Sequence, residues 1–361
     1  MNNENNPKKR LIRIAARPAF SNEDANPYNS LLYKAIQLDS QVMVQEHRYS
    51  LRPWSIDIFH LHWPEFDVLP KSMTIFDLAK KMAVWAWIFI AKLFDVKIIW
   101  TAHNAFGHDT KSTTLNKFLW KYFLSILDGV IYLSEESKDI LEKEYPNLRQ
   151  VKSTIVKHGH YGPWISNVRH EKKQANGKIS KLLDALSTDF LILHFGQIRS
   201  YKNVDELMRQ FTEIKIPNLR LMIAGNVPDK NYLEKLRSLQ QRDPRIILFA
   251  HHLDDASLVA CLERADLVAL PYKKILNSGS ALMALSFGAH VIVPAIGSME
   301  SLQRDVGEES ITLYEGDFSA GILQKLISEI KVKKAVSPNL TEYEWKSLGE
   351  KTNIFYRNLI N

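Results

Sequence analysis

Short apolar segments alternate with longer segments of helical periodicity along nearly the whole chain, and this alternation constrains the fold more than any other feature. In the first half we predict strands at residues 11–15, 56–62, 96–101, 129–133 and 154–157. Helical spacing of apolar residues occurs between them, at 28–37, 75–94, 115–127 and 135–144. Strands that alternate with helices form parallel sheets covered on both faces, so the pattern predicts a doubly wound α/β fold.

The alternation is interrupted once, by the polar interval NVRHEKKQANGKISK at residues 167–181. It then restarts, with strands predicted at 190–195, 219–224, 245–249, 267–270 and 291–293 and helices at 204–211, 232–240, 255–263 and 281–287. A chain of 361 residues exceeds what one hydrophobic core usually supports. We therefore predict two Rossmann-like doubly wound domains, at residues 1–168 and 182–340, and an aromatic, amphipathic helix in the C-terminal segment 341–361.

Charge and cysteine content narrow the class of protein. The net charge of +7 favours an acidic partner: nucleotide phosphates, nucleic acid or an anionic membrane. Nucleic acid is not expected, because no recognition motif is interleaved with the basic residues. Cys261 is the only cysteine, which excludes disulfides and indicates a reducing compartment. We expect a cytoplasmic location, because the longest apolar run, residues 82–91, is about half of a membrane span and no leader pattern is found.

Two loops of the second half carry the residues expected to bind a ligand, because doubly wound sheets bind ligands at the carboxyl ends of their strands. HFGQIRSYKN places Gly196 at a strand end and Arg199 and Lys202 behind it, and Asn203 or Asp205 could cap the next helix. The cations suit a diphosphate, since Arg199 offers a planar fork and Lys202 a point charge.

The second loop opens a helix at Ser278, Gly279 and Ser280, preceded by Asn277. Amides at a helix start attract anions, and Gly279 lets a phosphate approach the backbone closely. An ordinary serine cap with solvated lysines around it is the alternative. Two further strand ends carry polar residues of the same candidate site, Asn226 and His252.

Several motifs of the second half resemble those of the GT-B glycosyltransferases, in particular the bacterial polysaccharide and lipid-linked sugar transferases. FGQIRSYKNVDEL is similar to their phosphate loop G-R-x5-K-G-x3-L, with Lys202 at the matching distance from Gly196. FAHHLDDASLVACLERADLVALPY, residues 271–288 and AIGSMESL are similar to the motifs that follow it. The first half matches more weakly, through TAHN, VIYLSEESKDIL and IVKHGHY.

The resemblance implies an arrangement and a set of roles. It implies a cleft between an acceptor-binding first domain and a second domain that binds the nucleotide sugar, with the C-terminal helix packed back on the first domain. The residues expected at the donor are Gly196, Arg199, Lys202, Asn226, His252, Asn277, Ser278, Gly279, Ser280 and, from the hinge, His158 or His160.

This sequence also departs from the family pattern at informative positions. Ile275 and Met283 stand where the family has the two glutamates of Glu-x7-Glu. The arginine beside the glycine is Gln197 here, so Arg199 would have to replace it. The glycine-rich turn after the first strand is replaced by RPAFSNEDANPYNS, residues 17–30. These changes leave nucleotide binding as the expectation and leave the sugar open.

The chemistry needs a stabilised leaving diphosphate and, if the anomeric carbon inverts, a base for the acceptor hydroxyl. HLHWPEFD follows a strand of the first domain, and we predict Glu65 as that base with Asp67 behind it. A solvated loop acid is the alternative. In a retaining enzyme a separate base is dispensable, and His103 of TAHN becomes the more informative residue.

Cofactors and metals are not expected. The chain has no H-E-x2-H, paired-cysteine or spaced Asp-x-Asp pattern, and Asp254 and Asp255 are best interpreted as a helix cap. No strand is followed by G-x-G-x2-G, which disfavours a dinucleotide enzyme. The only small molecule predicted is the donor itself, a UDP- or GDP-linked sugar.

Residues 71–125 suggest the kind of acceptor. They contain eight lysines and three acids around MAVWAWIFIAKLF, which would suit a peripheral contact with the inner, anionic membrane face. The alternative places Trp85 and Trp87 in the first core.

The function predicted is transfer of a hexose from a nucleotide-diphosphate sugar to a lipid-linked saccharide acceptor in surface polysaccharide synthesis. The acceptor partner expected is a saccharide or a polyprenyl-diphosphate-linked acceptor. A catalytically silent binding subunit and a GT-B nucleotide-sugar epimerase are the alternatives.

Overall fold

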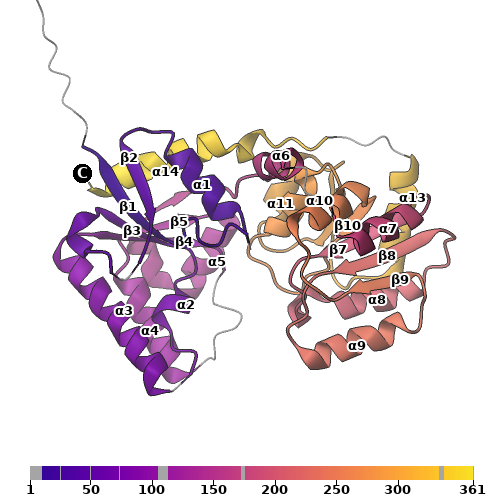
Figure 1. Ribbon diagram of the computed structural model, residues 1–361, viewed down its shortest axis with the longest axis horizontal. Coiled ribbons are helices and arrows are strands. Elements are labelled where there is room, and N and C mark those ends of the chain that lie inside the picture. Colours follow the sequence, from indigo (N-terminus) through magenta and orange to yellow (C-terminus); the bar gives the residue numbers. More distant parts are fainter. Residues whose placement is uncertain are drawn as a thin grey trace, which may run out of the picture. The chain divides into compact units, whose positions relative to one another are not determined.

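A computed structural model of the protein describes residues 10–24, 26–48, 50–72, 74–104, 113–171, 175–332 and 337–360. The chain forms two compact units (Figure 1). Unit 1 comprises Met1–Gly159 and Tyr343–Asn361, and unit 2 comprises His160–Glu342. The division therefore precedes the polar interval 167–181, which carries the end of one helix and the start of the next.

Each unit contains one six-stranded sheet, and every strand pair in both sheets is parallel. The order in unit 1 is β2-β1-β3-β4-β5-β6 and in unit 2 it is β12-β11-β10-β7-β8-β9. The strands of unit 1 are β1 (Ile12–Arg17), β2 (Val42–Glu46), β3 (Ile58–Leu61), β4 (Lys97–Ala102), β5 (Gly129–Tyr132) and β6 (Lys152–Ile155). Those of unit 2 are β7 (Phe190–Phe195), β8 (Leu219–Ala224), β9 (Ile246–Phe249), β10 (Leu267–Ala269), β11 (His290–Pro294) and β12 (Ile311–Tyr314). The predicted fold class, two doubly wound parallel α/β sheets, is confirmed.

Two of the observed strands, β2 and β12, were not predicted from the sequence. Both are edge strands with a partner on one side only. Such a strand is less completely buried, as Met43 of β2 and Thr312 of β12 show, and its apolar signal is correspondingly weak.

Helices connect the strands in both units. Those of unit 1 are α1 (Tyr28–Ile36), α2 (Glu65–Val68), α3 (Ile75–Leu93), α4 (Thr114–Ser125), α5 (Glu135–Glu144) and α14 (Trp345–Ile360). Those of unit 2 are α6 (Gly162–His170), α7 (Gly177–Ala185), α8 (Val204–Thr212), α9 (Lys230–Gln240), α10 (Asp255–Arg264), α11 (Gly279–Ser286), α12 (Met299–Val306) and α13 (Ala320–Val332). Within these described ranges, no helix is both long enough and apolar enough to cross a bilayer.

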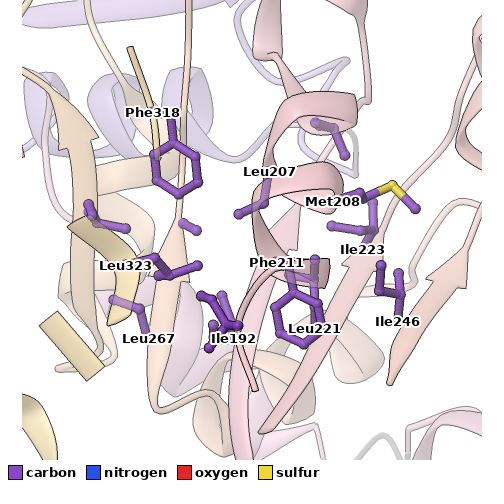
Figure 2. Packing of buried hydrophobic residues seen from close by; sticks show 14 of the residues in the cluster. Ile192, Leu207, Met208, Phe211, Leu221, Ile223, Ile246, Leu267, Phe318 and Leu323 are labelled. Atoms are coloured by element: carbon purple, nitrogen blue, oxygen red, sulfur yellow. The ribbon is translucent and has the colours of Figure 1, made fainter. Parts of the chain in front are cut away.

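The core of unit 2 lies between its sheet and three helices, α8, α9 and α13 (Figure 2). Ile192 and Leu221 of the sheet, Leu207 and Phe211 of α8 and Leu323 of α13 are all fully buried there. Neighbouring strand residues such as Leu191 and Leu193 are equally buried on the other face, so the sheet is covered on both sides. A rigid sheet of this kind fixes the positions of the loops that leave its strands.

The C-terminal helix α14 is part of unit 1 and packs on α1. A Cβ at Gly349 would lie 2.8 Å from the carbonyl carbon of Ala35, so only glycine permits this approach. The Asn353 amide donates to the Ile36 carbonyl at 2.9 Å, and Arg357 pairs with Asp39. These contacts fix the aromatic side chains of α14 against the sheet.

Of the two tryptophans of α3, Trp87 belongs to the interior of unit 1 and Trp85 is half-buried. The Trp87 indole is buried and donates to the Leu51 carbonyl at 2.9 Å, and the Trp85 indole donates to the Val68 carbonyl at 3.1 Å. The alternative, in which the tryptophans lie in the first core, therefore holds for Trp87 and only in part for Trp85. Other side chains of α3 are exposed instead.

Candidate active site

The loops after β7 and β10 meet at the carboxyl edge of the unit 2 sheet. β7 comes first in the chain, yet it lies inside the sheet between β10 and β8. Chain order therefore reverses here, which is where doubly wound sheets bind their ligands. The two loops contact each other directly, because the Lys273 amide donates to the Tyr201 carbonyl at 2.9 Å.

Lys202 ends a 3₁₀ turn, Ser200–Lys202, in the first of these loops. Its side chain is 8% exposed, and its Nζ lies 5.6 Å from the centre of the Tyr272 ring. No carboxylate of the described residues forms an ion pair with it. Burial, reinforced by the nearby Arg199 guanidinium, lowers the pKa of Lys202 to about 8. A buried ammonium without an anionic partner is costly, so a negatively charged ligand would stabilise it.

Small residues from both loops surround this ammonium. A Cβ at Gly196 would lie 3.5 Å from Lys202 Nζ and 3.9 Å from Ser280 Oγ. Ser278 caps α11 by accepting from the Ala281 amide at 3.0 Å, so the ordinary serine cap is also present. The side-chain amide of Asn277 is buried, and its Nδ2 has no acceptor in the described part of the chain.

Gln197 stands where the resemblance places an arginine, and its side chain accepts two hydrogen bonds from Arg199. Its Oε1 accepts from Arg199 Nε at 3.1 Å and from Arg199 Nη2 at 3.0 Å. Arg199 is half-buried and close enough to Lys202 to affect its pKa. The structure thus brings Gly196, Arg199, Lys202 and Ser280 together within one unit.

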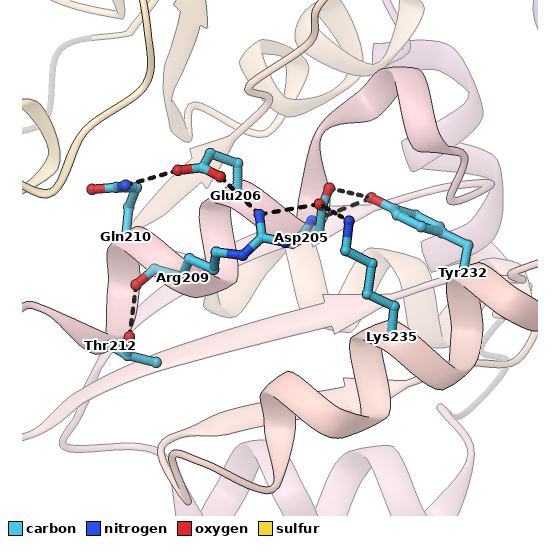
Figure 3. Close-up of polar contacts among 7 residues, drawn as sticks. All are labelled: Asp205, Glu206, Arg209, Gln210, Thr212, Tyr232 and Lys235. Carbon is cyan, nitrogen blue, oxygen red and sulfur yellow. Dashed lines mark hydrogen bonds and ion pairs between the residues drawn. The ribbon is translucent and has the colours of Figure 1, made fainter.

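A polar network holds α8, and with it the turn that carries Lys202 (Figure 3). Asp205 accepts from the Tyr232 hydroxyl at 2.9 Å and from Lys235 Nζ at 2.5 Å. Arg209 pairs with Asp205 at 3.2 Å and with Glu206 at 2.8 Å. The predicted helix cap is therefore wrong. Asn203 occupies the cap position in a left-handed conformation without a side-chain bond, and Asp205 binds α9 instead.

The two remaining donor residues predicted in unit 2 lie on the same edge of the sheet. Asn226 follows β8 and His252 follows β9, and both are exposed. No hydrogen bond in the described ranges joins either side chain to the group around Lys202.

In unit 1, a chain of hydrogen bonds joins three histidines behind the carboxyl ends of β3 and β4. His103 Nε2 lies 2.9 Å from His62 Nδ1, and His62 Nε2 lies 2.6 Å from the Tyr33 hydroxyl. Tyr33 is 2.9 Å from His60 Nδ1, and His60 Nε2 is 2.7 Å from Thr101 Oγ1. Burial lowers the pKa of His60 to about 3 and holds the pKa values of His62 and His103 well below 6.5, so these imidazoles are neutral.

His103 is held in place by aromatic rings. The Trp63 ring stacks on it with centroids 4.6 Å apart, and Tyr28 meets it edge-on at 5.0 Å. His158 lies beside the same Tyr28 ring at 4.3 Å, and burial lowers its pKa to about 4. His103 and His158, predicted from distant motifs, therefore share one aromatic neighbour within unit 1.

Glu65 begins α2 and is buried, with 6% of its surface exposed. The solvated loop acid is therefore the wrong alternative. Burial, with a contribution from Asp67, raises the pKa of Glu65 to about 7. Asp67 itself pairs with Arg17 Nε at 2.6 Å. The two carboxylates thus differ, since one is engaged by an arginine and the other is poised to titrate near neutral pH.

The loop that replaces the glycine-rich turn is organised around an internal anion. Glu46 Oε2 accepts from the amides of Ala19, Phe20 and Ser21 at 3.0, 2.8 and 2.9 Å. Three successive amides directed at one oxygen form an anion nest. In this protein its occupant is the carboxylate of Glu46.

Comparisons with known proteins agree with this arrangement. Residues 189–330 match the family described as "Glycosyl transferases group 1". The chain is 26% identical over 352 residues to the "GDP-mannose:glycolipid 4-beta-D-mannosyltransferase" of Xanthomonas campestris pv. campestris, covering 94% of this chain and 93% of that protein. The chain is thus similar to glycosyltransferases over nearly its whole length, and it has the GT-B fold. The resemblance recognised in its motifs is thus confirmed.

Solved structures show how widely this glycosyltransferase fold is shared. A glycosyltransferase from Rickettsia africae superposes with a TM-score of 0.67 at 14% identity, covering 98% of this chain and 99% of that one. Anabaena HepE in complex with UDP and glucose superposes with a TM-score of 0.65 at 14% identity, covering 96% and 99%.

Some residues of the candidate site were not predicted. Tyr272 lies under Lys202, and His194 of β7 meets the Tyr272 ring at 6.4 Å while its Nδ1 bonds the Ala269 carbonyl at 2.8 Å. The alternating pattern marks position 194 as buried, and a histidine there is a signal that could have been used. Tyr33 gives no such signal, because an aromatic residue on a helix is typical of any core.

In the described ranges, no three His, Cys, Asp or Glu side chains are arranged to hold a metal ion.

Proposed function

We propose that this glycosyltransferase moves a hexose from a nucleotide-diphosphate sugar to a lipid-linked saccharide in surface polysaccharide synthesis, without a metal. The observation that carries the proposal is the buried ammonium of Lys202 at the switch point of unit 2, which pairs with no carboxylate of the described residues. A diphosphate leaving group would supply the missing anion. Stabilising that group is normally the largest electrostatic contribution to such a reaction.

The donor phosphates would be held from two sides. Lys202 and Arg199 supply positive charge, and Asn277 Nδ2 and the first amides of α11, at Gly279 and Ser280, supply hydrogen-bond donors. Asn226, His252 and His158 complete the donor set that we propose.

The relative from Xanthomonas indicates which donor and acceptor to examine first. Its name specifies GDP-mannose, a glycolipid and a β linkage. We propose GDP-mannose as the donor and a glycolipid as the acceptor of this chain. Transfer from an α-linked donor to a β-linked product inverts the anomeric carbon and requires a base on the acceptor hydroxyl. Glu65 suits that role, because its pKa of about 7 lets it take a proton at neutral pH.

We also propose that unit 1 docks on an anionic membrane surface through α3 and α4. One face of α3 is buried, yet Ile75, Met82, Phe89 and Leu93 on the other face are between 61% and 77% exposed. Their spacing places them on one stripe of the helix. A helix that is apolar on both faces needs a cover, and an exposed patch of this kind marks an interaction surface.

The neighbouring helix extends this surface. Phe118 and Tyr122 of α4 are exposed, and the Tyr122 ring lies 5.4 Å from that of Trp85 on α3. Exposed lysines border the apolar residues, at Lys71, Lys80, Lys117 and Lys121. Apolar side chains with a basic border match the chemistry of an anionic bilayer, where a lipid-linked acceptor would be met.

The test is a transfer assay with the purified protein and a lipid-linked saccharide, comparing GDP-mannose with UDP-glucose in the presence and absence of EDTA. The proposal predicts glycosylated lipid from GDP-mannose and equal rates with EDTA. Tight nucleotide-sugar binding without any product would instead support a silent binding subunit, and conversion of the sugar without acceptor would support an epimerase.

A further inference from the structure

The distances in the hydrogen-bond chain behind His103 indicate which atom donates and which accepts in its contacts. A neutral imidazole and a hydroxyl each carry one proton, so each can donate once along the chain. Bonds donated by O–H are shorter than bonds donated by N–H. The contact between Tyr33 and His62 Nε2 is 2.6 Å, which fits a phenol that donates to nitrogen.

The positions of the protons on His62 and His103 follow from that assignment. With Nε2 as acceptor, His62 carries its proton on Nδ1 and donates it to His103 Nε2, at a distance of 2.9 Å. The proton of His103 is then on Nδ1. On the other side of Tyr33, His60 Nδ1 lies 2.9 Å from the Tyr33 hydroxyl and 2.7 Å from the Tyr356 hydroxyl, and His60 Nε2 lies 2.7 Å from Thr101 Oγ1, so these contacts do not fix the proton of His60. The two distances that join Tyr33, His62 and His103 agree with this single direction.

We propose that Tyr33 and His62 are positioning residues that fix His103 as a neutral hydrogen-bond donor, with its Nδ1–H offered to the substrate. The inference rests on the proposed glycosyl transfer and refines the role of His103 in it. His103 Nδ1 has no partner among the described residues, and the ring is only half-buried. Trp63 and Tyr28 fix the plane in which that N–H points.

This assignment separates the roles of the two candidate catalytic residues. A general base must present a lone pair, and His103 presents none at Nδ1 in this tautomer. An N–H held in a buried, preorganised network can stabilise a developing negative charge on a sugar or phosphate oxygen. Proton abstraction is then left to Glu65. The low pKa values of the three histidines support the same conclusion, because a cation is disfavoured throughout the network.

The chain offers a matched pair of variants, Tyr33→Phe and Tyr356→Phe. Both tyrosines are fully buried, and both hydroxyls contact His60 Nδ1, at 2.9 and 2.7 Å. Only the Tyr33 hydroxyl also contacts His62. Tyr33→Phe removes the donor to His62 Nε2, so that nitrogen takes the proton, which is the form preferred by an isolated neutral imidazole. His62 Nδ1 then accepts from His103 Nε2, and the Nδ1–H of His103 is lost.

The measurement is the tautomer of His103, from long-range ¹H–¹⁵N NMR of the full-length protein labelled at histidine. We expect Nδ1–H in the wild type and in Tyr356→Phe, and Nε2–H in Tyr33→Phe. We expect Tyr33→Phe to lower kcat by about 100-fold, the usual size for a lost transition-state donor, with little change in KM for the donor. Nε2–H in the wild type, or an unchanged tautomer in Tyr33→Phe, would overturn the proposal.

A second comparison guards against a misfolded variant. His62→Asn places an amide N–H where Nδ1–H stands and retains donation to His103 without Tyr33, whereas His62→Gln does not. We expect His103 to keep its Nδ1 proton in His62→Asn and to lose it in His62→Gln, and the reverse result would contradict the assignment. Because the tautomer is read without substrate, an inactive wild type would refute the proposed function and leave this inference to be decided by the spectra.

Discussion

Two buried ionisable residues, Lys202 and Glu65, have pKa values displaced toward neutrality, and these displacements explain the chemistry proposed for each. Burial lowers the pKa of Lys202 to about 8 and raises that of Glu65 to about 7. In both cases the charged form is disfavoured in the free protein. The first residue therefore gains from an anionic ligand, and the second can accept a proton at neutral pH.

Glu65→Gln tests the second role through pH. A base must be ionised, so kcat/KM of the wild type should rise with pH and level off above about 7. Glutamine cannot accept the proton, and we expect a loss of roughly 100-fold or more and no rise of this kind. A wild-type profile that is flat between pH 5 and 8 would exclude Glu65 as the base.

Glu65→Gln should also change the pH dependence of the free energy of unfolding, because Glu65 stabilises the folded protein at low pH, where it is inactive as a base. The folded pKa of Glu65 lies above its ordinary value of 4.5, so the folded state binds more protons between pH 4.5 and about 7. The contribution of this group to stability is present at low pH and is lost as pH rises through 7. The difference in Tm between Glu65→Gln and the wild type should therefore be more positive at pH 8 than at pH 5.

At the scale of elements, much of the fold was predictable from the sequence, and the failures have identifiable causes. Strands such as Phe190–Phe195 were predicted at their observed bounds. This strand lies inside the sheet, with a paired strand on each side, and nearly all of its residues are buried, so its apolar signal is strong. The edge strands β2 and β12 were missed. Ser278 and Asp254 cap their helices as their residue types indicate, whereas the side chain of Asp205 is captured by Tyr232 and Lys235 from α9. Local sequence cannot show such a competitor.

The contact between α14 and α1 gives a prediction for an element. Gly349→Ala would place a Cβ 2.8 Å from the Ala35 backbone and force α14 outward, and we expect a loss of about 1–3 kcal/mol in the free energy of unfolding. Gly177→Ala is the matched control, because no atom lies within 4 Å of the added Cβ. Denaturant unfolding of both variants measures the difference, and equal stabilities would show that α14 does not depend on this approach.

At the scale of the whole molecule, the candidate site depends on residues that are distant in the sequence. Lys202, Arg199 and Ser280 were found because their loops match a family pattern. The hydrogen-bonded histidines were not predicted as a network. Its other members, Tyr33, Thr101 and Tyr356, come from three elements that are distant in the sequence, and only the fold brings them together. Likewise, the exposed face of α3 could not be separated from its buried face until the burial of Trp87 was known.

Membrane docking is a property of the whole protein and can be measured on it. We expect the wild type to sediment with liposomes that contain anionic lipid and to remain in the supernatant with neutral ones. Met82→Glu combined with Phe89→Glu should abolish sedimentation, because both side chains lie on the exposed face of α3. Ile354→Glu, on the exposed surface of α14, should bind as the wild type does. Equal binding of all three proteins would remove α3 from the contact.

The central claim is that Lys202 is kept buried and unpaired to bind the donor diphosphate, and calorimetric titration of GDP and UDP tests it most directly. Lys202→Met keeps the length of the side chain and removes its charge, and Lys230→Met on the exposed start of α9 is the control. The account predicts that Lys202→Met loses nucleotide affinity by tenfold or more, on the order of the 1.5–3 kcal/mol of a charged hydrogen bond, while its Tm without ligand is unchanged or higher. Affinity equal to that of the wild type and of Lys230→Met would contradict it.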